Sequence, residues 1–278
     1  MTLASDLVLQ GLIEKFAPKD KARLLAMLPH GKELKMLPTS SIPSPQVPLT
    51  SFIHYSWFLP VLQAYSPEEA SCFLPLFSEK SAKQIRQLLN LPEGPKELSL
   101  LIAAFLNELL LASLQDKDLV PIEFLPQDPL SSLALLDKEA ILKIISLLPI
   151  FDLALMLPKI IDKSLLNTIN SHLMPLQRAF LQTLKAKNLA PVFADLPLGS
   201  AMNAKEFHSQ MQKRGLITLR LTLSASHPCL VWYIAHILDI GRGNLLLQLP
   251  QKEIPSATRQ MLVAEVQTAL SFVKNWQE

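Results

Sequence analysis

The sequence predicts an all-α fold in which short helices stack like armadillo or HEAT repeats, in two or three subdomains. Apolar residues make up 49% of the 278 residues, and Leu is abundant in almost every segment. Only seven Gly occur against 22 Pro, which argues against strands joined by tight turns. Short helices between prolines bury too little apolar surface alone, so they must pack on neighbours. No exact sequence period is visible, so any repeat is structural.

Pro-rich stretches suggest how the first two thirds of the chain are divided. Residues 1–36 contain two short helical patterns, and residues 37–50 form a linker rich in Pro and Ser. A helical unit follows at 51–115. Residues 116–130 hold several prolines and acids and are expected to form a second linker, before another helical unit at 131–198.

Helix starts are marked clearly in the first unit. Ser66 is expected to cap a helix, with Pro67 at its first position and Glu69 closing a capping box. Ser78 precedes a second helix, and a longer, Leu-rich helix is expected over residues 97–114.

The second unit begins with a helix of strong apolar character. Asp137 is expected to cap residues 138–148, and Pro149 to end that helix. A separate short helix is expected at 152–157. Four apolar residues recur at helical spacing and should form one buried stripe: Ile141, Ile144, Ile145 and Leu148.

The C-terminal region, residues 199–278, is less uniform. Asn203 and Glu206 form a capping box for a helix that Gly215 would end as the residue after its C-cap. Residues 216–223 alternate apolar and polar side chains, which predicts a short strand, with helix as the competing interpretation. Two further helices are expected, at 227–238 and 256–276.

Charge and cysteine content narrow the classes of partner and compartment. A net charge of +2 without a basic run gives no footprint for nucleic acid. Cys72 and Cys229 lie far apart, which favours a reducing compartment over a disulfide framework. The N-terminus has no basic region of a signal peptide. Glu108 interrupts the apolar stretch 98–115, and polar residues interrupt 221–238, so neither favours a membrane span. We therefore expect a cytoplasmic protein, at most peripheral to a membrane.

The sequence contains no motif that indicates a catalytic, metal or cofactor site. His227, Cys229 and His236 are a His/Cys cluster, but zinc sites show tighter pairing and a fourth ligand is not evident. Gly241, Arg242 and Gly243 follow a helix, which fits a helix-ending turn better than a dinucleotide loop. We expect no enzyme activity, no metal and no cofactor.

Two groups of residues resemble the flagellar motor switch protein FliG. The first corresponds to its C-terminal signature: Leu135-Leu136-Asp137, Ile141, Ile144 and Ile145, Leu153-Ala154-Leu155 and Leu157, then Ile169-Asn170-Ser171. The second resembles its middle domain, where a Glu-His-Pro-Gln element precedes an apolar helix and a Pro-Glu-Gln-Ala turn. Here those places read Ile53-His54-Tyr55-Ser56 and Pro67-Glu68-Glu69-Ala70. The resemblance implies two armadillo-like units in family order, covering about half of the chain.

The resemblance also indicates residues that could bind a partner. His54 is the one residue kept from the Glu-His-Pro-Gln element, and Lys138 and Glu139 stand where FliG carries Asp-Arg in the helix that meets the stator. Trp57 and Phe58 beside His54 are either core residues or aromatic anchors of an interface.

Departures from the family argue against a rotary motor. Later Arg-Glu positions of the stator-facing helix read Ser146 and Leu147 here, so the charges that such a contact needs are missing. The resemblance therefore implies a non-flagellar type III secretion component, such as the SctK-type adaptor of the sorting platform. It would bind a basal-body ring protein and sorting-platform proteins, and could self-associate. The alternative is a type III secretion chaperone or regulator that binds a secreted protein.

Overall fold

The computed structural model describes residues 52–114, 119–184, 196, 198–199, 201–248 and 254–276. The chain divides into Met1–Pro48 and Leu49–Glu278, and all described residues belong to the second of these units. The helices expected within 1–36 and the linker at 37–50 lie outside the described residues.

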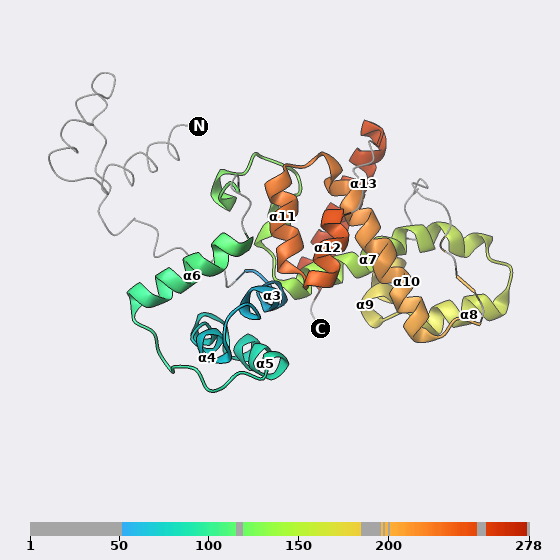
Figure 1. Ribbon diagram of the computed structural model, residues 1–278. Coiled ribbons are helices and arrows are strands. Elements are labelled where there is room, and N and C mark those ends of the chain that lie inside the picture. Colours follow the sequence, from blue (N-terminus) through green and yellow to red (C-terminus); the bar gives the residue numbers. More distant parts are fainter. Residues whose placement is uncertain are drawn as a thin grey trace, which may run out of the picture. The chain divides into compact units, whose positions relative to one another are not determined.

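The described residues form α-helices joined by loops and 3-10 turns, with no strand among them, which confirms the all-α fold (Figure 1). The α-helices are α3 (Leu59–Leu62), α4 (Pro67–Ser71), α5 (Glu79–Leu89), α6 (Leu100–Leu114), α7 (Lys138–Met156), α8 (Lys163–His172), α9 (Pro175–Leu184), α10 (Ala204–Thr222), α11 (Pro228–Ile237), α12 (Ile240–Gln248) and α13 (Ser256–Asn275).

Side-chain caps fix where several of these helices begin, as the sequence indicated. Ser66 accepts a hydrogen bond from the Glu69 backbone, and the Glu69 carboxylate accepts one from the Ser66 backbone at 3.0 Å. Asn203 and Glu206 make the same reciprocal pair at the start of α10. Asp137 accepts from the Ala140 backbone at 2.7 Å. Each cap satisfies backbone N–H groups that have no partner within the helix.

Helix α7 does not end at Pro149, and residues 152–157 are not a separate helix. The helix runs unbroken from Lys138 to Met156 with Pro149 inside it. Proline has no N–H to donate, so the Ile145 carbonyl loses its usual helical donor at this turn. Pro149 is itself buried, together with its neighbours on α7. Packing around this turn therefore outweighs the propensity of proline to break a helix.

Residues 216–223 are helical rather than a strand, because they lie almost wholly within α10. Gly215 does not end that helix but lies in its interior. A β-carbon at Gly215 would stand 1.9 Å from the Ile145 carbonyl oxygen, which is backbone and cannot move aside. Glycine is therefore needed where α10 closes onto the turn that Pro149 opens in α7. The alternation that suggested a strand belongs to a helix buried on several sides.

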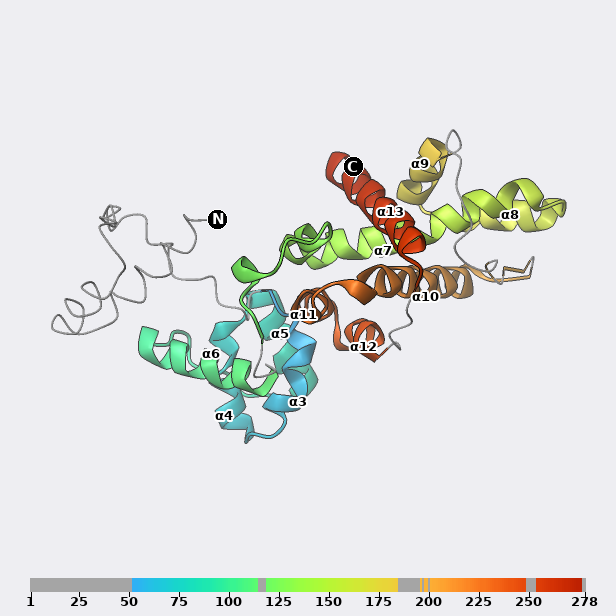
Figure 2. The same ribbon diagram turned by 90° about the horizontal axis from the view of Figure 1, so that it is seen from above.

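Helix α7 is central to the C-terminal packing, with α9, α10 and α13 against it (Figure 2). The predicted stripe is confirmed: four residues of α7 are each 1% exposed, namely Ile141, Ile144, Ile145 and Leu148. These four residues belong to one hydrophobic core that extends through the described residues. The ranges 131–198 and 199–278, expected as separate units, share this core.

A buried cluster of ionisable side chains joins α7, α10 and α13. Arg214 of α10 donates to Asp152 of α7 at 2.7 Å, and both side chains are mostly buried. Burial, and then the Asp152 charge, raises the pKa of Glu265 on α13 to about 8. Glu265 is therefore neutral near pH 7, which leaves the Arg214–Asp152 pair as the ionised part of the cluster.

Glu265 should make the protein less stable as the pH rises from about 6.5 to 8. In the unfolded chain its carboxyl ionises near its ordinary pKa of 4.5, whereas the folded chain keeps the proton until about pH 8. The folded state thus binds more protons between about pH 4.5 and 8. Each pH unit well inside that range removes about 1.4 kcal/mol, which gives about 1.6 kcal/mol between pH 6.5 and 8, where the folded carboxyl begins to ionise. Urea unfolding of Glu265→Gln, which mimics the neutral carboxyl, should show no such loss. An equal alkaline loss in both proteins would contradict the assignment.

Candidate functional site

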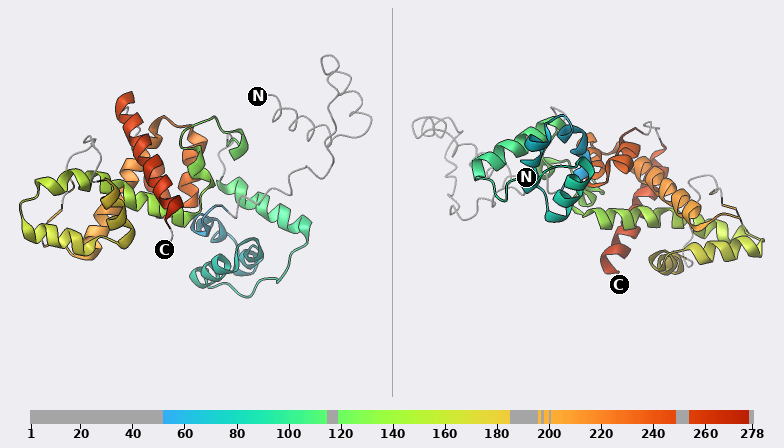
Figure 3. Two further views of the ribbon diagram at one scale, coloured as in Figure 1. Left: turned by 180° about the vertical axis from the view of Figure 1, so that it is seen from behind. Right: turned by 60° about the horizontal axis from the view of Figure 1, so that its bottom comes forward.

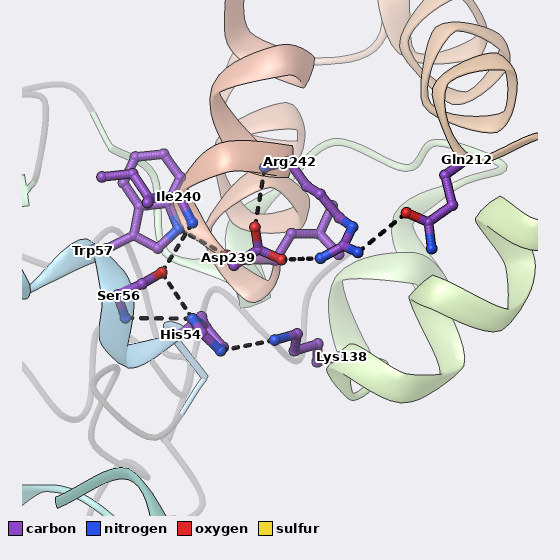
Figure 4. Close-up of polar contacts among 9 residues, drawn as sticks. His54, Ser56, Trp57, Lys138, Gln212, Asp239, Ile240 and Arg242 are labelled. Carbon is purple, nitrogen blue, oxygen red and sulfur yellow. Dashed lines mark hydrogen bonds and ion pairs between the residues drawn. The ribbon is translucent and has the colours of Figure 1, made fainter. Parts of the chain in front are cut away.

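The first candidate site is a polar network around His54, which precedes the 3-10 turn Tyr55–Trp57 (Figure 4). Lys138 at the start of α7 places its Nζ 2.8 Å from His54 Nε2. His54 Nδ1 lies 2.8 Å from Ser56 Oγ, which accepts a hydrogen bond from the Ile240 backbone at 2.9 Å. The Lys138 ammonium can only donate, so Nε2 faces it as an acceptor. Nδ1 lies against both the Ser56 hydroxyl and the Ser56 backbone N–H, which is 3.3 Å away and caps the 3-10 turn.

An ion pair continues the network on the other side. Asp239 and Arg242, at the start of α12, pair with each other, and Arg242 donates to Gln212 of α10 at 3.2 Å. Burial alone would raise the pKa of Asp239, but hydrogen bonds from Arg242 and the charges of Arg242 and Lys138 outweigh it and lower that pKa. Helix α12 begins at Ile240, so Gly241, Arg242 and Gly243 lie in its first turn. This corrects the expectation that these three residues form the turn that ends a helix.

An aromatic stack lies beside the network. His236 is held between Trp57 and Trp232, with ring centroids 4.1 and 3.8 Å away. Its Nδ1 donates to the Trp232 carbonyl at 2.8 Å, and Trp57 Nε1 donates to the Leu238 carbonyl at 2.8 Å. Gly243 allows this fit, because a β-carbon there would stand 2.4 Å from the Trp57 ring. The stack fixes the segment before α3 onto α11 and α12.

Both histidines are neutral at pH 7. Burial, and after it the charge of Lys138, lowers the pKa of His54 to about 4. Burial lowers the pKa of His236 to about 4, although its bond to Trp232 acts in the opposite direction. Protonation of either ring would place a second positive charge or an unpaired N–H inside packed structure.

Protonation of His236 should lower the stability of the folded protein at acidic pH. The unfolded ring binds a proton near pH 6.5 and the folded ring near pH 4, so the stability present above pH 6.5 is lost as the pH falls to 4. A difference of this size corresponds to about 3 kcal/mol. Denaturant melts at pH 7 and 4.5 should show a smaller acid loss in His236→Phe, which keeps the stack. An acid loss equal to that of the parent would show that His236 is not responsible.

Ser56 and His54 are the residue types of a nucleophile–base pair, but the geometry favours a structural role for them. Ser56 is 9% exposed, and its hydroxyl already holds the Ile240 backbone. The second nitrogen of His54 faces an ammonium group and not a carboxylate that would orient a base. Within the described residues, no three His, Cys, Asp or Glu side chains gather as metal ligands. His227 instead caps α11, with Nδ1 accepting from the Cys229 backbone at 3.2 Å. Cys229 Sγ accepts a hydrogen bond from the Val120 backbone at 3.4 Å.

The structure brings together part of the predicted partner-binding set. His54 and Lys138, 84 residues apart in sequence, are in direct contact. Trp57 is 8% exposed and Phe58 is fully buried, as the core interpretation requires. Glu139 is exposed on the first turn of α7. Trp57 and Phe58 therefore reach a partner only if the segment that holds them opens.

The second candidate site is an apolar surface on α6, which sequence reasoning did not single out. Helix α6 buries only Leu110 and Leu111 completely and lies along the rim of the part built from α3 to α5 (Figures 1 and 3). Leu106 and Leu114 are half-buried against the core. Five other large apolar side chains of the helix are exposed, and we call them the α6 face: Leu100, Leu101, Ile102, Phe105 and Leu109. The available signal was a Leu-rich stretch with a single charge, Glu108, and no polar side along the helix.

The exposed fractions are large for apolar side chains. Leu100 is 91% exposed, Leu101 81% and Phe105 61%. Isolated apolar residues on a surface are ordinary, whereas several exposed large apolar side chains on one helix indicate a candidate interaction site. The α6 face is therefore the surface best suited to bind another molecule among the described residues.

Comparison with protein-family models, curated protein sequences and solved structures finds no significant match. Function therefore rests on the residues and the geometry. Among the described residues, one stretch, Lys138–Lys159, is long and apolar enough to cross a membrane, with a mean hydropathy of 2.2. Half of its apolar window is buried inside the fold, where α7 serves as the central core helix.

Proposed function

We propose that this protein is a non-enzymatic adaptor that assembles with other proteins of a type III secretion apparatus, at the cytoplasmic face of the basal body. The observation that carries the proposal is the α6 face, an apolar surface on a helical unit whose other helices pack closely. The resemblance to FliG supplies the system and the partners: a basal-body ring protein and sorting-platform proteins. The stacking of helices on α7 is consistent with an armadillo-like repeat, which forms part of the proposal.

Contacts along α7 support assembly by packing and not by exposed charge. Leu147 is fully buried, and Ser146 donates its hydroxyl to the Lys143 carbonyl at 2.7 Å. Lys138 contacts His54, which leaves Asp137 and Glu139 as the exposed charges near the start of the helix. A stator-like contact needs complementary exposed charges, and this surface offers few.

Affinity purification of the tagged protein under mild detergent tests the proposal. Ring and sorting-platform proteins should co-purify with the parent chain and be lost with Leu101→Asp. The matched control is Ile161→Asp, because Ile161 is an equally apolar side chain, 94% exposed, outside α6. It should retain the partners. Recovery of a single secreted protein would instead support the chaperone, and retention of the partners by Leu101→Asp would contradict a role for the α6 face.

A further inference from the structure

Hydrogen bonds tie the segment His54–Trp57 to the junction of α11 and α12 (Figure 4). The bonds run from His54 N to the His236 carbonyl at 2.8 Å, from Trp57 Nε1 to the Leu238 carbonyl at 2.8 Å, and from Ile240 N to Ser56 Oγ at 2.9 Å. Lys138 at the start of α7 adds its contact with the His54 ring. We call this set of contacts the latch, because it holds the chain before α3 against α7, α11 and α12.

Both histidine rings of the latch fit only in their neutral form. His54 Nε2 faces the Lys138 ammonium, so a proton on that nitrogen would set two donors and two positive charges against each other. His236 uses Nδ1 to donate to the Trp232 carbonyl, so an added proton would go to Nε2, within a side chain that is 4% exposed. The flanking indole rings attract a cation, but the loss of hydration on burial is the larger effect and lowers the pKa of His236 to about 4.

The charges around His54 also oppose its protonation. Burial first, and the Lys138 charge second, lower the pKa of His54 to about 4, and Arg242 at the start of α12 acts in the same direction. The Asp239 carboxylate acts in the opposite direction, but it is paired with Arg242. Lys80 of α5 adds positive charge near Lys138. A proton on His54 would therefore enter surroundings that are already positive.

Acid should open the latch before it unfolds the helices packed on α7. The buried stripe of α7 is apolar, and Glu265 on α13 already holds its proton at pH 7, so acid does not change its charge. The latch histidines, by contrast, bind protons more tightly once they are released into water. Between pH 7 and 4.5, His236 alone should favour the open state about 60-fold. His54 is only half-buried, so its contribution is smaller.

We propose that the latch is an acid-sensitive switch, in which protonation of His54 and His236 releases the segment His54–Trp57 while the helices around α7 stay folded. Release would expose Trp57 and Phe58, which are 8% and 0% exposed while the latch is closed. Both aromatic side chains would then be accessible to another protein. The switch goes beyond the proposed adaptor function and does not depend on it, because it follows from contacts within one chain.

Hydrogen exchange of the full chain at pH 7 and 4.5, corrected for the intrinsic exchange rate at each pH, tests the switch. The backbone amides of His54 and Ile240 are bonded within the latch. On acidification they should lose at least about tenfold more protection than amides in the middle of α7. An equal loss in the latch and in α7 would show that acid unfolds the whole fold, and an unchanged latch would show that acid does not open it. Either result would overturn the proposal.

Substitutions assign the opening to the two histidines. A double variant, His54→Gln with His236→Phe, removes both imidazoles but keeps an acceptor for Lys138 and a ring in the stack, so its latch should stay protected at pH 4.5. The matched control, His208→Gln, alters a histidine of α10 outside the latch and should open like the parent.

A third variant decides the question if the double variant is already open at pH 7. In Lys138→Gln the amide oxygen can accept a hydrogen bond from protonated His54, so the latch should open at a lower pH than in the parent. Acid opening that is unchanged in the double variant, or unchanged in Lys138→Gln, would overturn the proposal.

Discussion

Replacing Ile145 with Asp is expected to unfold the C-terminal packing around α7. Ile145 is 1% exposed, and its backbone carbonyl meets α10 at Gly215. A carboxylate at this position would be removed from solvent inside the core, and burying an unpaired charge costs several kcal/mol. Because the net stability of a domain is about 5–15 kcal/mol, the loss should appear as a large fall in melting temperature and in helicity by circular dichroism.

A matched substitution separates burial from the chemical change itself. Ile161→Asp makes the same replacement at a side chain that is 94% exposed, and it should leave the melting temperature nearly unchanged. An Ile145→Asp variant that melts like Ile161→Asp would contradict the assignment of the α7 stripe to the core.

The second large effect is expected from Gly215→Val. A β-carbon at this position would lie 1.9 Å from the Ile145 carbonyl oxygen and 2.9 Å from its carbon. Both atoms are backbone within α7, so α10 has to move away and lose its packing. Overpacking a core costs about 1–3 kcal/mol and occasionally more, and the contact with backbone places this variant at the upper end, about 3 kcal/mol.

Gly241→Ala is the control for glycine replacement in a helix. A β-carbon at Gly241 would meet only Asp239 Oδ1, at 3.4 Å. Alanine is favoured over glycine within a helix by about 0.5–1 kcal/mol, so this variant should be as stable as the parent or slightly more stable. Denaturant unfolding measures both variants. Equal stabilities for Gly215→Val and Gly241→Ala would refute the close approach of α10 to α7.

Local signals in the sequence predicted the parts of the fold that depend on local physics. The caps at Ser66, Asp137 and Asn203 and the stripe on α7 follow from hydrogen bonding and helical period within a few residues. Pro149 and Gly215 were wrongly expected to end helices, because each residue was interpreted without its contacts in the fold. In the fold, the donor missing at Pro149 and the side chain missing at Gly215 meet across two helices, and no local pattern reports that contact.

The candidate sites were predictable to different extents. His54 and Lys138 were singled out separately, but their contact, across 84 residues, depends on how α7 lies against the segment before α3. The burial of Trp57 likewise depends on α11 and α12, which supply His236, Trp232 and Gly243 around it. The α6 face could not be recognised because a Leu-rich helix looks the same in sequence whether it is buried or exposed.

If the protein serves type III secretion as proposed, a secretion assay in its source organism tests the central claim, that the protein works by apolar contact through α6. The chromosomal variants are Phe105→Asp, which alters the α6 face, and Glu139→Lys, which reverses an exposed charge on α7. Exposed charge pairs contribute only about 0–1 kcal/mol, so Glu139→Lys should secrete normally, whereas Phe105→Asp should lose secretion at normal protein level. Normal secretion by Phe105→Asp, or loss of secretion by Glu139→Lys at normal protein level, would contradict the account.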